Sequence, residues 1–232
     1  TFAGTPTFPD GSIAVADLDI DGGTDINAAL VDADLMIVDD GAGGTNRKAT
    51  MARLATYMGT KIGGGLEFIA SSGAVSGVAS ISFTQFDATA YDHYKFYFQH
   101  VIPATDSVYM MAHASTDGGS SYDTTNGNYH YAGTSDHAGF EVTDKDGTNV
   151  GSDTNEFGIS GQFNLFAPHN SSAYTYADSY VKYMNTTAGS LSSRNLAATV
   201  HLVAADVDAI KFIFSSGNIE SGEITMFGIV NS

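Results

Sequence analysis

Short apolar or alternating runs recur from residue 66 onward, and turn-forming residues separate them. Runs of this length and pattern are typical of β-strands. The runs cover residues 66–70, 78–83, 94–101, 108–114, 156–166, 174–183, 196–203, 210–215 and 224–230. Because almost no helical pattern follows residue 65, the spacing predicts an antiparallel β-sandwich of jelly-roll type, with a closed barrel as the alternative.

The turn residues between these runs favour hairpins. They are Asp117-Gly118-Gly119, Asn126-Gly127, Asp146-Gly147 and Ser216-Gly217-Asn218, and such sequences close antiparallel strands. In the run 94–101, strict alternation places Tyr94, Phe96, Phe98 and His100 on one face and Lys95, Tyr97, Gln99 and Val101 on the other. Both faces carry aromatic rings, so we expect both to be partly covered.

The first part of the chain, residues 1–65, has a different pattern of residues from the rest. Thr45 or Asn46 can cap a helix over about residues 46–58 that Gly59 ends. Met51, Leu54, Ala55 and Met58 share one face of this helix, which packs on the strand at residues 35–38 or on a second copy of the chain. We expect oligomerisation through this face and strand, by Leu35, Ile37, Met51, Leu54 and Met58.

Three consecutive glycines, Gly63-Gly64-Gly65, predict a hinge. They divide the chain into an N-terminal α/β assembly segment, 1–65, and a sandwich domain, 66–232. Because the sequence starts at Thr1 without a leader, either a targeting segment has been removed or the chain is a fragment of a longer protein.

Charge and composition exclude several classes of partner and binding site. The formal net charge is −17, from 9 Lys and Arg against 26 Asp and Glu, which disfavours nucleic acid and anionic membranes as partners. No apolar run is long enough to insert into a membrane. Cysteine is absent, so disulfides and thiolate metal sites are excluded.

Two acidic clusters are candidate cation sites. Asp17, Asp19 and Asp21 match the opening of an EF-hand loop, but Ala28 stands where the bidentate Glu is required. A polar-faced strand running into a Gly-Gly turn is the stronger interpretation. Asp32 and Asp34, with Asp39 and Asp40, flank the 35–38 strand as solvated turn carboxylates, or they gather around a cation on an oligomer axis. We predict no cofactor.

The polar stretch 115–139 is the candidate binding loop, because long loops in compact domains are usually functional. Its Tyr, Asn, Asp and His side chains can stack on and hydrogen-bond sugars or polar surfaces. The candidate receptor contacts are Tyr122, Asp123, Asn126, Asn128, Tyr129, His130, Tyr131, Asp136 and His137. The alternative is a solvated or inter-subunit loop.

The remaining histidines do not predict a zinc site, and the sequence contains no motif that predicts catalysis. The histidines lack zinc-site spacing, and His113 and His201 fall in strands, where we expect partly buried sheet residues. No G-x-S-x-G elbow or glycosidase-like carboxylate pair is present, and the glycines of 41–48 lack the G-K-[ST] ending of a phosphate loop. We therefore expect a protein that is not an enzyme.

Six short segments resemble parts of known proteins. LDIDGGTDI (18–26), ALVDADLMIVDDG (29–41) and TNRK (45–48) are similar to an element that recurs in tail-fibre and other virion proteins of marine tailed phages. VIPATD (101–106), STDGGSSY (115–122) and SGEITMFGI (221–229) resemble β-sandwich domains downstream in such proteins. The resemblance implies a homo-oligomeric structural component, most simply a trimer, without catalytic residues.

Two functions remain open on this basis. The first is a tail-fibre or spike module on the particle exterior that contacts other virion proteins and attaches to a host-surface glycan or protein. The second is a capsid decoration protein, which grips capsid subunits and projects its sandwich.

Overall fold

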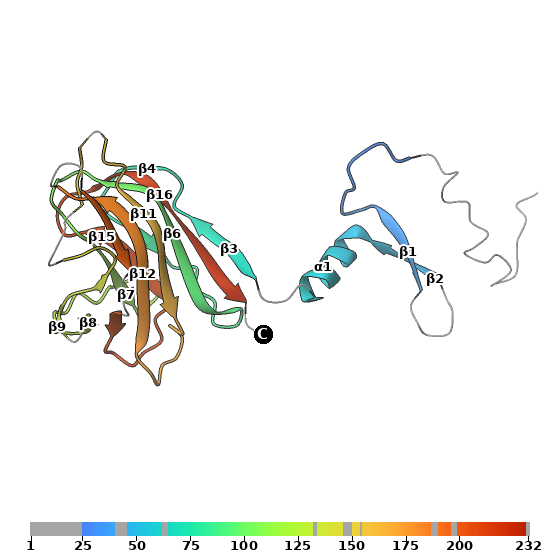
Figure 1. Ribbon diagram of the computed structural model, residues 1–232. Helices are drawn as coiled ribbons and strands as arrows, with labels where there is room; N and C mark the ends of the chain where they lie inside the picture. The colour runs from blue at the N-terminus through green and yellow to red at the C-terminus, as the bar shows by residue number, and fades with distance from the viewer. Residues whose placement is uncertain are drawn as a thin grey trace, which may run out of the picture. The chain divides into compact units, whose positions relative to one another are not determined.

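The computed structural model describes residues 25–39, 46–61, 65–131, 134–145, 150–153, 155–186, 190–195 and 199–230. The chain divides into two units, Thr1–Lys61 and Ile62–Ser232, which Figure 1 shows in sequence colours. The predicted division lay after Gly65.

The N-terminal unit contains a β-hairpin and one helix. Strand β1 (Leu35–Asp39) pairs antiparallel with β2 (Asn46–Thr50), and α1 (Met51–Lys61) follows directly. The prediction of a helix from residue 46 was wrong for residues 46–50, because each of them pairs with a residue of β1. The predicted end was also wrong, since Gly59 lies inside the helix.

Thr50 caps the helix in place of Thr45 or Asn46. Its Oγ1 accepts a hydrogen bond from the backbone N–H of Arg53 at 3.3 Å, which satisfies a free amide of the first turn. The N–H of Met51 donates to the Asp34 carbonyl at 2.9 Å, and that of Ala52 to the Asp32 carbonyl at 3.3 Å. These bonds tie the start of the helix to the turn before β1.

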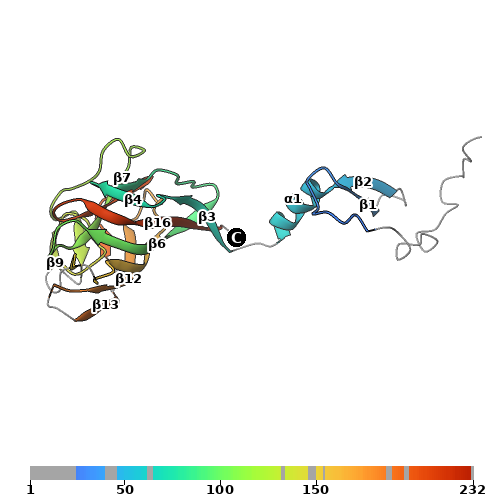
Figure 2. The same cartoon turned by 90° about the horizontal axis from the view of Figure 1, so that it is seen from above.

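The second unit is an antiparallel β-sandwich, as predicted (Figures 1 and 2). The smaller sheet has the order β10-β7-β15-β5, formed by Phe140–Glu141, Met110–Ser115, Ala209–Phe214 and Ile81–Phe83. The larger sheet has the order β3-β16-β6-β11-β12-β14-β8-β9, formed by Leu66–Ser71, Ile219–Val230, Tyr91–Pro103, Ile159–Phe166, Thr175–Met184, Thr199–His201, Tyr129–Tyr131 and Thr134–His137. Two further strands join it: β4 (Val75–Val78) pairs with β16, and β13 (Leu191–Asn195) pairs with β12.

The strand order is that of a jelly roll. The chain crosses from β4 in the larger sheet to β5 in the smaller, back to β6 and across to β7. It returns to the larger sheet for β8 and β9, crosses again to β10, and comes back for β11 to β14. Finally it passes from β15 in the smaller sheet to β16 in the larger. The first and last strands are neighbours, with Leu66 opposite Ile229. The strands β12, β14, β8 and β9 extend the larger sheet beyond this pattern.

Aromatic side chains fill the space between the sheets. Phe96 and Phe163 come from the larger sheet and Phe212 from the smaller, and all are fully buried. The ring of Phe212 lies 5.2 Å from that of Phe96 and 5.6 Å from that of Phe163, both edge-on. Burying a ring of this size contributes about 1.5–3 kcal/mol, so this cluster holds the two sheets together.

A bulge in β6 changes the predicted alternation. His100 has a φ of 49°, and the pairing with both neighbours shifts here, between Ile159 and Gly161 and between Ser221 and Glu223. Phe98 and Val101 are therefore both buried, while His100 is exposed. The prediction that His100 shares the buried face of Phe98 and that Val101 lies opposite was wrong, because the extra residue reverses the inside-outside order.

Other predicted strands differ in extent. The predicted run 78–83 divides into the end of β4 and β5, which lie in different sheets. The run 156–166 begins as a strand only at Ile159, and the described part of 196–203 contains β14. Asn126-Gly127 lies in a turn just before β8, whereas Asp146-Gly147 lies outside the described residues. In the part of the chain that the structure describes, no helix has the length and apolar character to span a membrane.

Candidate functional site

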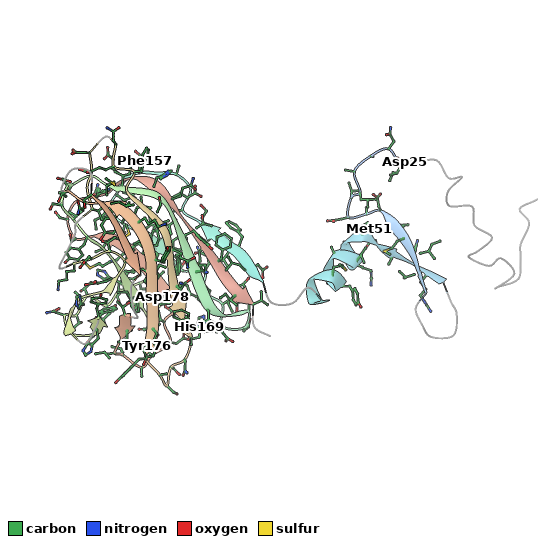
Figure 3. All side chains as sticks on the ribbon, in the orientation of Figure 1. Asp25, Met51, Phe157, His169, Tyr176 and Asp178 are labelled. Carbon is green, nitrogen blue, oxygen red and sulfur yellow. The ribbon has the colours of Figure 1, made fainter. Side chains whose placement is uncertain are left out.

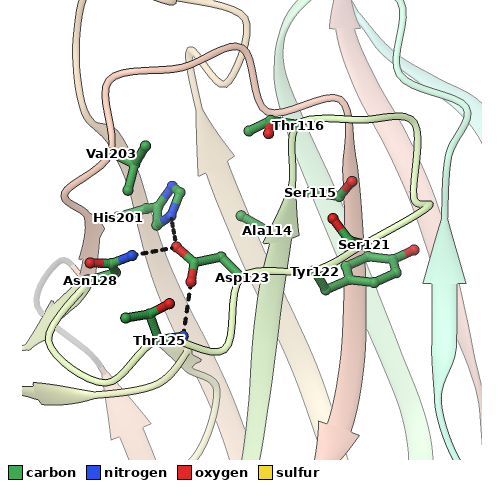
Figure 4. A pocket seen from close by; sticks show the side chains of 10 residues that line it. All are labelled: Ala114, Ser115, Thr116, Ser121, Tyr122, Asp123, Thr125, Asn128, His201 and Val203. Carbon is green, nitrogen blue, oxygen red and sulfur yellow. Dashed lines mark hydrogen bonds and ion pairs between the residues drawn. The ribbon is translucent and has the colours of Figure 1, made fainter.

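The loop between β7 and β8 is fastened to β14 by one carboxylate. Oδ2 of Asp123 lies 2.9 Å from Nε2 of His201 and accepts a hydrogen bond from the Asn128 side-chain amide at 2.8 Å. Oδ1 accepts one from the backbone N–H of Thr125 at 2.8 Å, and Figure 4 shows all three contacts. Asp123 thus connects two parts of its own loop with a strand distant in sequence.

These contacts keep Asp123 ionised. Burial by itself would raise the pKa of this carboxyl, but hydrogen bonds from His201, Asn128 and Thr125 outweigh it and lower the pKa to about 2. The imidazole of His201 is 1% exposed, and its Nδ1 has no hydrogen-bond partner. A buried histidine with one nitrogen committed to a carboxylate acts here as a rigid donor.

Tyr129 supports the same arrangement from inside. Its ring stacks on His201 at 4.7 Å, and its hydroxyl donates to the Asp123 carbonyl and accepts from the Ala114 N–H, each at 3.0 Å. Burial raises the pKa of this hydroxyl, so it stays protonated and able to donate. The loop is therefore held to both β7 and β14.

A pocket of about 340 Å³ opens beside this cluster. Its wall combines hydroxyl, amide and carboxylate groups with the Tyr122 ring and the His201 imidazole. Figure 4 draws these side chains, which come from the loop, from β7, from β14 and from the residues that follow β14. The lining residues are Ala114, Ser115, Thr116, Ser121, Tyr122, Asp123, Thr125, Asn128, His201 and Val203. Nζ of Lys211 lies 4.3 Å from the centre of the Tyr122 ring, which fixes that ring at the margin. The pocket fits a small polar group better than an apolar one.

The structure brings three of the predicted receptor contacts together at the pocket and buries two others. Tyr122, Asp123 and Asn128 meet at the pocket, together with His201, which was predicted only as a sheet residue. Tyr129 and His137 are 0% and 3% exposed, so the prediction that they touch a receptor was wrong. They are buried because β8 and β9 extend the larger sheet, which the polar sequence of this stretch did not indicate.

The remaining predicted contacts lie elsewhere. Asn126 lines a smaller pocket of about 60 Å³ with His137 and Glu141, where Nδ1 of His137 lies 3.0 Å from Oε1 of Glu141. His130 and Tyr131 are half-buried in β8. The side chain of Asp136 lies outside the described residues.

The two histidines predicted in strands are more buried than expected. His113 on β7 is buried like His201. Burial and the nearby charge of Lys211 lower the pKa of His113 to about 4. It is therefore neutral at physiological pH.

The described residues of the two acidic clusters do not form a metal site. Asp17, Asp19, Asp21, Asp40 and the side chain of Asp39 lie outside them. Asp34 accepts a hydrogen bond from the Val31 N–H through Oδ2 at 2.9 Å, as a turn carboxylate does. Within the described ranges, no three His, Asp or Glu side chains gather as a metal-binding group.

The predicted oligomerisation residues are largely exposed within the N-terminal unit. Leu35 and Ile37 project from β1, and Leu54 and Met58 from α1, with more than a third of each side chain exposed. Met51 is half-buried. Apolar side chains left open in this way can contact a second copy, and oligomerisation stays a prediction.

Sequence reasoning missed a second exposed surface, the outer face of β6, β11 and β12. Tyr97, Tyr176 and Tyr180 are 38%, 49% and 45% exposed there, and Figure 3 labels Tyr176 and Asp178 on β12. The signal was in the alternation of 175–183, where every second residue is buried and the residues between them are tyrosine or charged. Tyrosine in solvent-facing positions was the informative feature.

No protein-family model matches the sequence, and no curated protein matches it either.

Proposed function

We propose that this chain is a non-enzymatic structural module of a tailed-phage virion, of tail-fibre or spike type, that attaches the particle to its host. The observation that carries the proposal is the polar pocket beside Asp123, where loop residues are held rigidly on a jelly roll. Binding surfaces are often loops positioned by such a scaffold. The ligand is a polar group of a host-surface glycan or protein.

The chemistry of the pocket supports binding rather than catalysis. Asp123 is the one carboxylate among its lining residues, and its oxygens already accept hydrogen bonds from His201, Asn128 and Thr125. A carboxylate with a pKa of about 2 is a poor proton acceptor near neutral pH. Thr116, Ser121 and Tyr122 remain at the surface to contact a ligand.

The N-terminal unit supports assembly on the particle exterior. Its open apolar residues, Leu35, Ile37, Leu54 and Met58, can bury surface against other copies or other virion proteins. A homotrimer would present three pockets together. Three weak contacts on one rigid assembly reach a higher avidity than a single contact.

Competition with the parent phage tests this function. The purified 232-residue chain is added to host cells, and phage adsorption is measured; the Tyr122→Ala variant removes the ring at the pocket margin. Phe157→Ala is the matched control, because Phe157 is 68% exposed and lies outside the pocket. We expect the wild type and Phe157→Ala to block adsorption, and Tyr122→Ala to need at least about tenfold more protein, the loss expected when an aromatic ring is one of the few residues that carry most of the binding energy.

Two results would overturn the proposal. A wild-type chain that leaves adsorption unchanged but binds emptied capsids would be a decoration protein. Full competition by Tyr122→Ala would mean that the pocket is not the receptor contact.

A further inference from the structure

The outer face of β6, β11 and β12 carries two rows of rings with a polar row between them. In the first ring row, Phe166 lies opposite His93 on one side and Tyr176 on the other. In the second, Gln162 lies between Tyr97 and Tyr180. The polar row has Asn164 between Lys95 and Asp178.

Strand geometry gives this surface its dimensions. Neighbouring strands lie ~4.8 Å apart and successive residues rise ~3.3 Å, so each row spans roughly 10 Å across the three strands. Tyr176 and Tyr180 are four residues apart on β12, so the ring rows lie roughly 13 Å apart with the polar row midway. The surface can accommodate several linked sugar rings.

Contacts between neighbouring side chains hold the rows in place. The Asn164 amide donates to Oδ1 of Asp178, and the His93 and Phe166 rings meet edge-on at 5.6 Å. Nζ of Lys95 lies 5.9 Å from the centre of the Tyr97 ring, and Nζ of Lys182 lies 5.7 Å from that of Tyr180. Side chains ordered before binding lose little entropy when a ligand arrives.

A hollow extends the first ring row. It has a volume of about 400 Å³ and is lined by Tyr174, Tyr176, Ser172, Ala173 and Ala204. Tyr176 therefore belongs both to the flat surface and to a recess at its end. Such a recess could hold a terminal or branching sugar.

We propose that this face binds a neutral polysaccharide that lies across both ring rows. The C–H faces of pyranose rings pack on the aromatic rings, while sugar hydroxyls hydrogen-bond with Gln162, Asn164 and Asp178. This site is separate from the pocket at Asp123, and the proposal does not depend on that pocket.

Charge decides between neutral and acidic glycans. On the three strands, the charged residues of this face are Lys95, Lys182 and Asp178, so the face is close to neutral. The whole chain carries −17 and repels an anionic polymer at long range. A neutral chain meets no such barrier and can use the hydrogen-bonding groups of the polar row.

Affinity electrophoresis and calorimetry with the full chain test the proposal. The probes are dextran, galactomannan and a mixed-linkage β-glucan, with alginate as the acidic comparison, and an array of neutral hexopyranose oligosaccharides widens the choice. We expect binding to at least one neutral probe and none to alginate. Tyr176→Ala and Tyr180→Ala should each weaken binding about tenfold, because aromatic rings are among the few residues that carry most of the binding energy, and Asn164→Ala should weaken it several-fold.

Matched controls separate this face from the rest of the molecule. Phe157→Ala should bind the probe like the wild type, because Phe157 is exposed and lies outside both the face and the pocket. Tyr176→Leu keeps an apolar side chain without a ring, so a loss of binding with an unchanged unfolding midpoint reports on stacking and not on folding. Tyr176→Leu can also replace the alanine variant in this test if the alanine variant fails to fold.

The outcomes that contradict the proposal are distinct. No binding to any neutral probe, or equal binding to alginate, would overturn it. If Tyr176→Ala and Tyr180→Ala instead lower the mass in light scattering, a second copy of the chain occupies this face. A wild type that blocks phage adsorption but binds no neutral probe would leave the attachment function standing and remove this proposal alone.

Discussion

Nε2 of His201 lies 2.9 Å from Oδ2 of Asp123, and 78 residues of sequence separate the two. One belongs to β14 and the other to the loop after β7, so this contact fixes a loop to a strand of the larger sheet. The shape of the pocket therefore depends on a pairing that forms only when the whole sandwich has folded.

Asp123 should make stability depend on pH in the acidic range. Its pKa is about 2 in the folded chain and about 3.9 when unfolded, so the folded state binds fewer protons between these values. The free energy of unfolding should fall by up to about 2 kcal/mol as pH drops from about 4 to 2. Asp123→Asn should lose this part of the pH dependence and about 1–3 kcal/mol at pH 7, measured by urea unfolding.

Asp92→Asn is the control for this measurement, because Asp92 is exposed. It should retain both the wild-type stability at pH 7 and the wild-type slope. If the two variants have the same free energy of unfolding at every pH, the contact between Asp123 and His201 adds nothing to stability.

His113 should make the free energy of unfolding depend on pH in a higher pH range than Asp123 does. Burial and Lys211 hold its pKa at about 4, whereas the unfolded chain protonates it near 6.5. The unfolded state therefore binds more protons between these values, and the free energy of unfolding should decrease as pH falls from about 6.5 to 4. Urea unfolding of His113→Gln should show a shallower decrease, while His100→Asn, which changes an exposed histidine, should keep the wild-type slope.

Gly161 should tolerate no side chain. It has a φ of 144°, and an added Cβ would overlap the carbonyl oxygen of Tyr180 on β12. Gly161→Ala should lower the free energy of unfolding by on the order of 3 kcal/mol. Gly73→Ala, at φ 60° with nothing within 4 Å of the new Cβ, should cost only about 1 kcal/mol; similar losses in thermal unfolding would contradict the close-approach explanation.

Self-association should depend on the N-terminal unit. Leu54 and Met58 are one turn apart on α1 and are exposed, so charges at both positions would oppose an apolar contact between copies. We expect the Leu54→Asp, Met58→Asp double variant to have a monomeric mass in light scattering while the wild type is oligomeric. Leu191→Asp changes an exposed leucine of the sandwich and should not alter the mass; a monomeric wild type would refute the prediction.

Local patterns predicted the strands of the sandwich well, because alternation and glycine turns act over a few residues. They failed where distant pairing decides the outcome. Residues 46–50 look helical alone but pair with β1, and the bulge at His100 arises where β6 meets both β11 and β16. Neither partner can be deduced from the segment itself.

The candidate site was predicted in part for the same reason. Tyr122, Asp123 and Asn128 were suggested by residue type, but their connection to His201 is a tertiary contact. Tyr129 has a residue type suited to binding and serves as a buried support. Tyr176 and Tyr180 could have predicted the outer sheet face, if tyrosines in solvent-facing strand positions had been given more weight than the length of the polar loop.

Leu66, at the start of β3, lies opposite Ile229 near the end of β16. The polypeptide therefore comes into the sandwich and leaves it at the same end of one strand pair. If both ends are pulled apart, the hydrogen bonds between β3 and β16 carry the load one after another and not in parallel. This edge is where mechanical force would open the domain first, while the aromatic core between the two sheets would still be intact.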